Sequence, residues 1–355
     1  MSGKKKLTYA AAGVDVDVYE EAKDEFAKII AASNAKSPFA DCVVAGLGTF
    51  GSIFDTKKAA AKLGFSNYAD VESVDSVGTK ISVAVAMDRY DTIGLDMLGH
   101  SCNDILVQGA IPLVFGDYLA FSKFDKRMVI DVIKGVAQGC EEAGMILHFG
   151  ETAELPGVYR EGELDLVGTV RGVVDLDNVI TGDSVIPGDV LIGVESNGLH
   201  TNGFSLARKA LFDVQGYKVT DEISEIGGVL GDVLLAPHTN YLKPLKELFP
   251  QRIIHGIAHL TGGGFKNNII RILPQSCQAK IKLNSWEILP IFKLIQNAGE
   301  IEDVEMYKTF NMGIGIVIAC DSENENTINE VFTKHKMKTY RIGSVAEGNK
   351  DVLFE

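Results

Sequence analysis

The stretch that decides the fold runs from Leu113-Val-Phe-Gly-Asp-Tyr-Leu-Ala120 through the segment Lys126 to Ala143 and into Met145-Ile-Leu-His-Phe149. Its first and last parts are short apolar runs typical of buried strands, and its middle part repeats apolar residues at the spacing of an amphipathic helix. A strand, a helix and another strand in this order predict a protein of mixed α and β structure.

The same alternation continues on both sides of this stretch. We predict strands over Val71 to Asp75 and Leu164 to Val174, and a helix over Asp91 to Gln108. The chain of 355 residues exceeds the ~250–300 residues at which one hydrophobic core usually stops growing. The turn Pro187-Gly188-Asp189 marks a change of unit, so we expect two domains, residues 1–173 and 174–355.

The second half restarts with an apolar strand and also mixes strands with helices, without an internal repeat at a fixed 20–50-residue period. An α/β (α+β) class is therefore predicted for both halves. The expected strands are Val190 to Val194, Ile253 to Ala258, Ile314 to Ala319 and Lys338 to Ser344, and the expected helices are about Asn202 to Phe212, Val233 to Leu248 and Phe265 to Ile272.

Composition excludes several classes of protein. The formal charge of −14 disfavours binding to nucleic acid or anionic membranes, and no apolar stretch approaches the ~20 residues of a membrane span. The five cysteines are scattered without a C-x-x-C pair, which favours small buried residues in a reducing compartment. We therefore expect a soluble cytoplasmic protein, with the basic run Lys4 to Lys6 in a solvated tail.

Acidic residues gather near the ends of predicted elements between positions 75 and 104. Carboxylates at such ends can converge on magnesium bound to nucleotide phosphates, and Lys80 adds a cation for those phosphates. Part of the set, together with His100, shares one face of the predicted helix. A capped, solvated helix face is the alternative for any single residue. The candidates are Asp75, Lys80, Asp96, Asn103 and Asp104.

Two glycine-containing segments are weaker candidates. The loop Gly46-Leu-Gly48-Thr-Phe-Gly51 could bring backbone N–H groups close to a phosphate, but it matches neither a Walker A sequence nor a dinucleotide fingerprint, and a flexible loop is the alternative. Gly150 to Gly157 places Glu151 and Thr152 at the exit of a predicted strand, where active-site groups commonly lie. A surface turn is the competing interpretation.

Two further segments precede predicted helices. Thr261-Gly262-Gly263-Gly264 combines flexible backbone with the free N–H groups of a helix start, which is typical of an anion site. Ser196, Asn197 and His200 lie before another helix, where His200 is as consistent with a structural histidine as with a ligand-binding one. Residue chemistry alone therefore reaches a two-domain α/β protein that binds a magnesium–nucleotide.

The combined motifs resemble those of the aminoimidazole ribonucleotide synthetase family. The resemblance spans nearly the whole chain, so chance agreement of one motif does not explain it. The matching segments, in the family's order, are Leu7 to Asp17, Asp75 to Lys80, Asn103 to Ala110, Gly150 to Gly157, His200 to Arg208, His255 to Phe265 and Glu305 to Gly313.

The resemblance implies an ATP-dependent ligase that converts formylglycinamidine ribonucleotide to aminoimidazole ribonucleotide, ADP and phosphate in purine biosynthesis. It also implies magnesium, with potassium as an additional cofactor, and a homodimer in which the N-terminal domains join in a β-barrel. The C-terminal domain is expected to be a separate α/β unit.

The resemblance also implies roles for the candidate residues. Asp75, Asp96 and Asp104 are expected to hold magnesium; Lys80, Asn103 and the glycines Gly46, Gly48 and Gly51 to bind ATP; and Asp75, Lys80, Glu151 and His200 to act in catalysis. Substrate or phosphate is expected at Glu151, Thr152, Ser196, Asn197, His200, Thr261, Gly262, Gly263 and Gly264. Three positions depart from the family pattern, namely Thr49, Ser76 and Phe149, where added side chains restrict close backbone approach.

Two kinds of alternative remain open. Other ATP-binding enzymes of the superfamily, such as selenophosphate synthetase, thiamine-monophosphate kinase or the amidotransferase-coupled synthetase of the preceding purine step, would use a similar metal cluster. The sequence has neither the reactive cysteine beside a lysine of the first nor the large amidotransferase part of the last. A non-catalytic nucleotide-binding protein, like the maturation proteins of metallo-enzymes, is the second alternative, although the chain ends at Glu355 without their cysteine-bearing tail.

Overall fold

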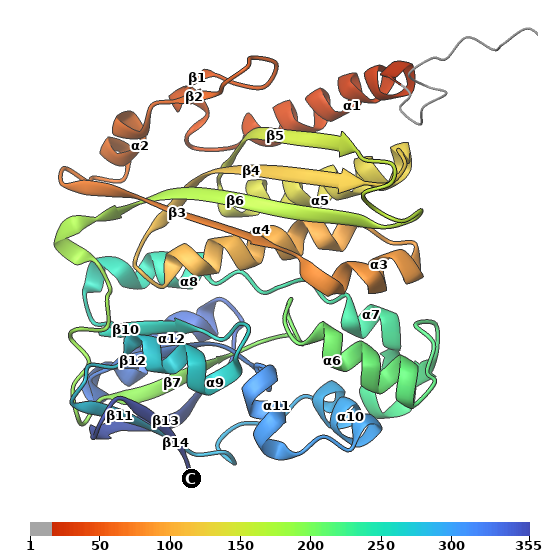
Figure 1. Ribbon diagram of the computed structural model, residues 1–355. Helices are drawn as coiled ribbons and strands as arrows, with labels where there is room; N and C mark the ends of the chain where they lie inside the picture. The colour runs from red at the N-terminus through yellow and green to blue at the C-terminus, as the bar shows by residue number, and fades with distance from the viewer. Residues whose placement is uncertain (1–15) are drawn as a thin grey trace, which may run out of the picture.

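The computed structural model describes residues 16–355, so the Lys4 to Lys6 run and nearly all of the Leu7 to Asp17 motif lie outside the described residues. Two α/β halves stack on one another, the first half above the second in Figure 1. The chain passes between them after residue 175. The mixed α/β class predicted from the sequence is confirmed.

The first half is a four-stranded sheet in the order β3-β6-β4-β5, in which β4 and β5 are parallel and the other neighbours antiparallel. Helices α4 and α5 pack together and cover one face of this sheet (Figure 1). The elements are α1 (Val16–Asn34), β1 (Val43–Ala45), β2 (Ile53–Phe54), α2 (Thr56–Lys62), β3 (Tyr68–Ser76), α3 (Ile81–Met87), α4 (Asp91–Leu106), β4 (Ile111–Phe121), α5 (Lys126–Ala143), β5 (Ile146–Glu154) and β6 (Leu164–Asp175).

Helix α5 has the bounds that its sequence pattern predicts. Its start is fixed by Asp125, whose side chain accepts a hydrogen bond from the backbone N–H of Met128 at 3.1 Å, which satisfies an otherwise free helix donor. Its end is fixed by Gly144 in the left-handed conformation (φ 70°), which suits glycine because it has no Cβ. The apolar stripe of the helix is buried against α4 and α1.

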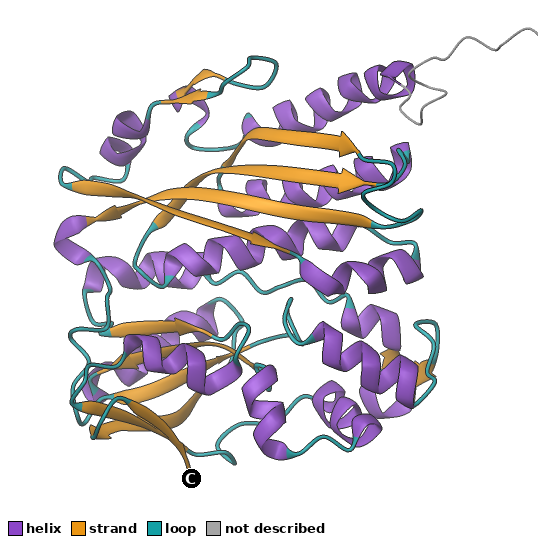
Figure 2. Cartoon of the chain, viewed as in Figure 1, coloured by secondary structure: helices purple, strands orange, loops and turns teal. Residues whose placement is uncertain are grey.

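The opposite face of this sheet carries exposed apolar side chains. Val74 on β3 is 66% exposed, Tyr118 on β4 36% and Phe149 on β5 39%. The strands therefore form a twisted half-barrel with one covered and one open face (Figure 2).

The second half contains a six-stranded sheet in the order β10-β12-β7-β13-β11-β14, antiparallel except for β11 and β14. Its central strands β7 and β12 are almost fully buried. The elements are β7 (Val190–Glu195), α6 (Phe204–Arg208), β8 (Glu222–Ile223), β9 (Gly228–Val229), α7 (Leu230–Leu234), α8 (Leu242–Leu248), β10 (Gly256–His259), α9 (Gly264–Ile269), β11 (Cys277–Ile281), α10 (Pro290–Gly299), α11 (Asp303–Thr309), β12 (Ile314–Cys320), α12 (Glu325–Lys334), β13 (Thr339–Glu347) and β14 (Asp351–Phe354).

Several element predictions were wrong in their bounds, among them the strand predicted over Ile253 to Ala258, which is β10 and starts at Gly256. The single helix predicted over Val233 to Leu248 is two short helices, α7 and α8, separated by a segment around Pro237, because proline disfavours helix at the preceding residue. Strand β5 continues through Glu154, so Gly150 does not begin a turn. The helix predicted from Asn202 starts at Phe204 and passes into a π-helical turn.

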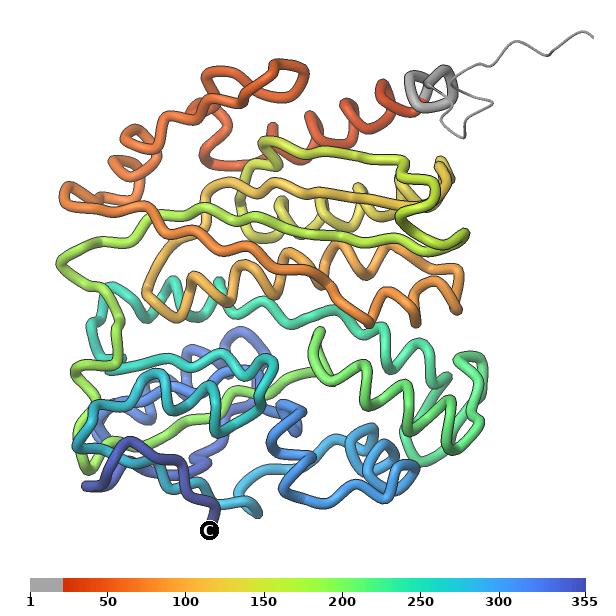
Figure 3. Tube along the Cα trace, in the orientation of Figure 1, coloured from red at the N-terminus to blue at the C-terminus, as the bar shows by residue number. Residues whose placement is uncertain are grey.

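Residues 236–241, which lie between α7 and α8, run along α4 and join the two halves (Figure 3). Backbone N–H groups of His238 and Tyr241 donate to the side chains of Asp96 and Asn103 on α4, at 2.8 and 3.1 Å. Among residues 16–355, no helix has the length and apolar content needed to cross a membrane.

Candidate active site

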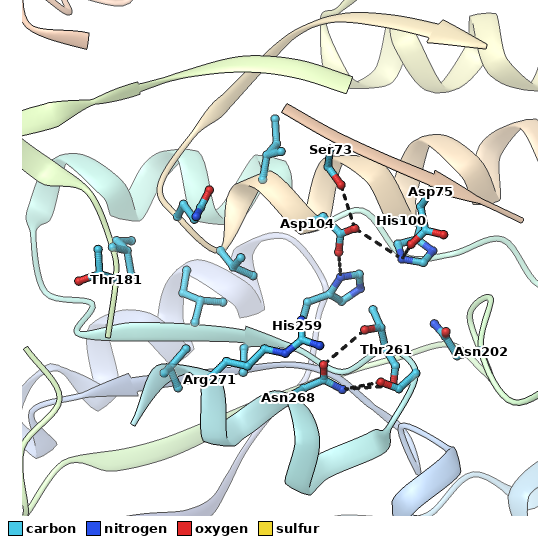
Figure 4. A pocket seen from close by; sticks show the side chains of 18 of the residues that line it. Ser73, Asp75, His100, Asp104, Thr181, Asn202, His259, Thr261, Asn268 and Arg271 are labelled. Carbon is cyan, nitrogen blue, oxygen red and sulfur yellow. Dashed lines mark hydrogen bonds and ion pairs between the residues drawn. The ribbon is translucent and has the colours of Figure 1, made fainter. Parts of the chain in front are cut away.

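A cleft of about 740 Å³ opens between the two halves. Strand β3 and helix α4 supply one wall, and the end of β10, the following turn and α9 supply the other (Figure 4). The polar residues that line it are Glu72, Ser73, Asp75, His100, Asp104, Gln108, Thr181, Asn202, His259, Thr261, Asn268 and Arg271.

Two of the predicted metal ligands meet in this cleft. His100 Nε2 lies 3.1 Å from Asp75 Oδ2 and 3.7 Å from Asp104 Oδ2, so the histidine bridges both carboxylates (Figure 4). Burial lowers the pKa of His100, but the bond to Asp75 and the charge of Asp104 outweigh it and raise that pKa above its usual value. Burial likewise raises the pKa of Asp75, yet the contact with His100 leaves it lowered.

The opposite wall adds a turn and a cation. Asn268 donates to the backbone oxygens of Gly264 at 2.7 Å and Thr261 at 3.2 Å, which fixes the turn before α9. Thr261 and Gly262 border the cleft, whereas Gly263 and Gly264 are not among its lining residues. Arg271, exposed at the end of this segment, also reaches the cleft (Figure 4).

Asp96 and Lys80 lie away from this cleft. Both side chains are fully buried, and Lys80 Nζ donates to Asp96 Oδ1 at 2.7 Å and to the backbone oxygens of Ala236 at 2.7 Å and His200 at 3.2 Å. Burial lowers the pKa of Lys80 and raises that of Asp96. The α4 face therefore divides, because Asp96 and Asn103 hold the 236–241 segment while His100 and Asp104 face the cleft.

The glycine-rich loop and the Glu151 region form a separate group. Gly48, Glu151 and Thr152 line a second pocket of about 370 Å³ with Asp117 and residues of α1. Gly46 and Gly51 lie in the loop between β1 and β2, and Figure 1 shows these two strands beyond β5, at the sheet edge opposite β3. Burial raises the pKa of Asp117 to about 7. Within one chain, these residues do not meet Asp75 or Asp104.

The segment from Ser196 to His200 turns back beneath the cleft. Ser196 Oγ donates to the backbone oxygen of Gly198 at 2.9 Å, and Asn197 Nδ2 to that of Pro237 at 2.7 Å. His200 is 1% exposed and neither ring nitrogen has a hydrogen-bond partner. None of these three lines the cleft; Ser196 and Asn197 shape the turn through their hydrogen bonds, whereas the ring nitrogens of His200 make none.

Four of the seven histidines gather at the cleft, where His100 and His259 line it and His200 and His238 are buried behind them. His259 Nδ1 lies 2.8 Å from Asp104 Oδ1, and His238 Nε2 lies 3.1 Å from His259 Nε2. The ring of His200 stacks on that of His238 with centroids 3.9 Å apart. Burial holds the pKa of His200 and of His238 well below the usual value.

Family models match both halves of the chain. The AIR synthase related protein N-terminal domain matches residues 57–174, and the C-terminal domain of the same description matches residues 187–354. The chain belongs to the AIR synthase family. In the first half, the matched region ends on the last residues of β6.

Relatives with substantial sequence identity align with almost the whole chain. The phosphoribosylformylglycinamidine cyclo-ligase of Brevibacillus brevis is 42% identical over 348 residues, 98% of this chain and 97% of the relative. The protein of that name from Thermoanaerobacter pseudethanolicus is 43% identical over 347 residues, 98% of this chain and 100% of the relative.

Solved structures with the same fold are much more distant in sequence. Thiamine-monophosphate kinase from Stenotrophomonas maltophilia matches with a TM-score of 0.66 at 15% identity, over 92% of this chain and 95% of that one. The hydrogenase maturation protein HypE of E. coli matches with a TM-score of 0.64 at 16% identity, over 94% and 93%. These likenesses concern the fold alone.

Several residues that line the cleft are not among the site residues predicted from the sequence. His100 was recognised only as a neighbour on the helical face, while Arg271 and Asn268 lie on the helix predicted after the glycine turn. Their positions relative to that turn could have indicated them, since a helix starting there brings its next turns to the same wall. Nothing in the local sequence pairs His238 with His259.

Proposed function

We propose that this protein catalyses the ATP-dependent ring closure of formylglycinamidine ribonucleotide to 5-aminoimidazole ribonucleotide, with release of ADP and phosphate, in purine biosynthesis. The observation that carries the proposal is the 42–43% identity, over nearly the whole chain, to relatives named phosphoribosylformylglycinamidine cyclo-ligase. ATP phosphorylates the formyl amide oxygen, which turns it into a leaving group. The amidine nitrogen then attacks the formyl carbon and forms the ring C–N bond, the bond from that carbon to the phosphorylated oxygen breaks with release of phosphate, and the nitrogen loses a proton.

The cleft residues suit this chemistry. Asp75 and Asp104 present carboxylate oxygens to the cleft, 42% and 26% exposed, and such oxygens are the ligands that Mg²⁺ prefers. We propose that they hold the magnesium, which supplies positive charge to the ATP phosphates. Asp96 does not fit this role because Lys80 already neutralises it in a buried pair. Arg271 offers the cleft a cation for phosphate in the place expected for Lys80.

His100 orients the two carboxylates, since one ring nitrogen lies against both. We assign Lys80 and Asp96 to positioning the 236–241 segment that forms the floor below. Much of the catalysis of phosphoryl transfer is positioning and neutralisation of charge, so a rigid floor contributes directly.

We propose a homodimer formed through the open face of the half-barrel, because Val74, Tyr118 and Phe149 leave an apolar surface there. Pairing of two such sheets would close a barrel and bury that surface. The second pocket, with Gly48, Glu151 and Thr152, lies on this half of the molecule and would then border the dimer interface.

Potassium remains part of the proposal as an additional cofactor. We also propose that the protein works in the cytoplasm, because its buried free cysteines fit a reducing compartment.

A coupled assay tests the proposed reaction. Purified protein is supplied with formylglycinamidine ribonucleotide, ATP, magnesium and potassium, and ADP release is followed together with the diazotisable aminoimidazole product. We expect equal amounts of both products, and no ADP when the ribonucleotide is omitted. ADP release with thiamine monophosphate as acceptor, and without aminoimidazole, would replace the proposal with the kinase alternative.

A further inference from the structure

The buried histidine cluster next to the cleft contains one side chain, that of His200, whose polar atoms have no partner. His200 is enclosed, and both of its ring nitrogens lack a hydrogen-bond partner in the structure. A buried polar group without a partner costs about 1–3 kcal/mol, so such groups are rare unless something binds them. The backbone of His200 also has a positive φ of 61°, a conformation that nonglycine residues seldom adopt.

The surroundings of His200 supply two further imidazoles. Ring nitrogens of His200, His238 and His259 all lie within 4.8 Å of one another. A tetrahedral zinc ion with Zn–N bonds of about 2.0–2.1 Å separates its ligand nitrogens by roughly 3.4 Å. The 3.1 Å between His238 Nε2 and His259 Nε2 is already close to that value. We propose that these three histidines form a binding site for a zinc-type divalent ion.

The hydrogen bonds around the cluster match what such an ion needs. A metal-bound histidine usually donates its other ring N–H to a carboxylate or another oxygen, which fixes the tautomer. His259 Nδ1 lies 2.8 Å from Asp104 Oδ1, and His238 Nδ1 lies 3.3 Å from Thr201 Oγ1. Both Nε2 atoms become free to bind metal when the proton between them moves from His238 Nε2 to His238 Nδ1. The pair therefore loses no proton.

The third ligand comes from His200 by rotation of its ring. It stacks on His238 at an interplanar angle of 22°, so its ring must turn for a nitrogen to face the same ion as His238. This turn breaks no hydrogen bond of the His200 ring, because the ring makes none. The ion would satisfy one of its orphaned nitrogens and replace the single contact between His238 and His259.

The ligand set selects the class of ion and separates this site from the magnesium site. Three imidazoles suit zinc, copper or nickel, whereas magnesium prefers oxygen ligands and retains water. His259 also lines the cleft, which gives an ion a route inward and leaves the fourth position to water. The ion would tie together the turn before α6, the 236–241 segment and the end of β10. The site does not depend on the proposed cyclisation.

Calorimetric titration of ZnCl₂ into tag-free, chelator-treated full-length protein tests the proposal. We expect one zinc ion per chain, no displacement by excess magnesium, and the intense visible absorption of four-coordinate cobalt when CoCl₂ replaces zinc. His200→Asn keeps a residue tolerant of positive φ and should weaken zinc binding by more than about 100-fold, since loss of an outer-shell partner alone costs 10–100-fold. His335→Asn, outside the cluster, should bind zinc as the wild type does.

A second variant keeps the proposal testable if His200→Asn fails to fold. Thr201→Val removes the hydroxyl that lies 3.3 Å from His238 Nδ1 and 2.9 Å from His100 Nδ1, and it should weaken zinc binding about 10–100-fold because His238 loses its outer-shell partner. Absence of one-to-one zinc binding in the wild type would overturn the proposal, as would equal affinity in all three variants. Circular dichroism of each variant confirms that the fold is retained, and cyclisation activity is measured separately because its presence or absence leaves the binding result unchanged.

Discussion

Replacing Lys80 by methionine should destabilise the protein strongly, because it leaves a buried carboxylate without its counter-ion. Lys80 Nζ makes three hydrogen bonds, to Asp96 and to two backbone oxygens, and both charged side chains are fully buried. Asp96 Oδ2 already lacks a partner. Removal of one member of a buried ion pair typically costs about 3–5 kcal/mol, and we expect a loss of that size in the free energy of unfolding.

The pH dependence of this loss tests the cause. The folded-state pKa of Asp96 is raised by burial and should rise further without Lys80, so the folded variant binds a proton that the unfolded chain releases above about pH 4. Stability of the variant should therefore fall as pH rises through the folded-state pKa of Asp96, relative to the wild type. The loss measured at pH 5 should be smaller than the loss at pH 8.

Urea unfolding followed by circular dichroism measures both effects. Lys36→Met is the matched control, because Lys36 pairs with Glu141 at 2.8 Å on the surface, with the two side chains 60% and 41% exposed, and such pairs contribute little. Lys80→Met combined with Asp96→Asn should recover part of the loss. If Lys80→Met unfolds like the control at both pH values yet has lost activity, the structural reasoning is refuted and Lys80 returns to the role of phosphate ligand.

Four further outcomes are expected. Asp75→Asn should lower kcat/KM for magnesium–ATP by at least about 100-fold with an unchanged urea midpoint, and wild-type kinetics would remove Asp75 from the site. Gly94→Ala should cost about 1–3 kcal/mol or more in unfolding free energy, since its Cβ would lie 2.4 Å from the Val136 backbone, whereas Gly228→Ala, with nothing within 4 Å, should not. Val74→Glu should shift the light-scattering mass from dimer to monomer; an unchanged mass would place the interface elsewhere. Iodoacetamide at pH 8 should leave native Cys102 unlabelled, because burial raises its pKa to about 12, and label it after unfolding.

Much of the fold could be predicted where periodicity and caps act locally. The bounds of α5 follow from its apolar spacing, the Asp125 cap and Gly144. The Val233 to Leu248 prediction passed over Pro237, which disfavours helix at the preceding residue, and an apolar run cannot show that partners on another element hold the backbone after it extended. Those partners are Asp96 and Asn103, more than 130 residues away in the chain.

The candidate site was predictable in part for the same reason. Helical spacing placed four residues of α4 on one face, but it could not say which of them would be covered. Packing of the 236–241 segment covers Asp96 and Asn103 and leaves Asp104 at the cleft. Likewise, the length of β5 decides where Glu151 lies, and a strand of nine residues carries it into the second pocket instead of the cleft.

The hydrogen bonds between α4 and the 236–241 segment have a consequence for exchange of parts between relatives. The two halves are held together in their shared interior by the buried Lys80–Asp96 pair and by backbone N–H groups of the 236–241 segment that donate to α4. The covalent connection after β6 is therefore a minor part of what unites them. A chimera that takes its first half from one relative and its second half from another should fold correctly only if the counterparts of Lys80 and Asp96 are compatible with the path of its 236–241 segment. The success of recombination within this fold therefore depends on the interface between the two halves more than on the position of the crossover.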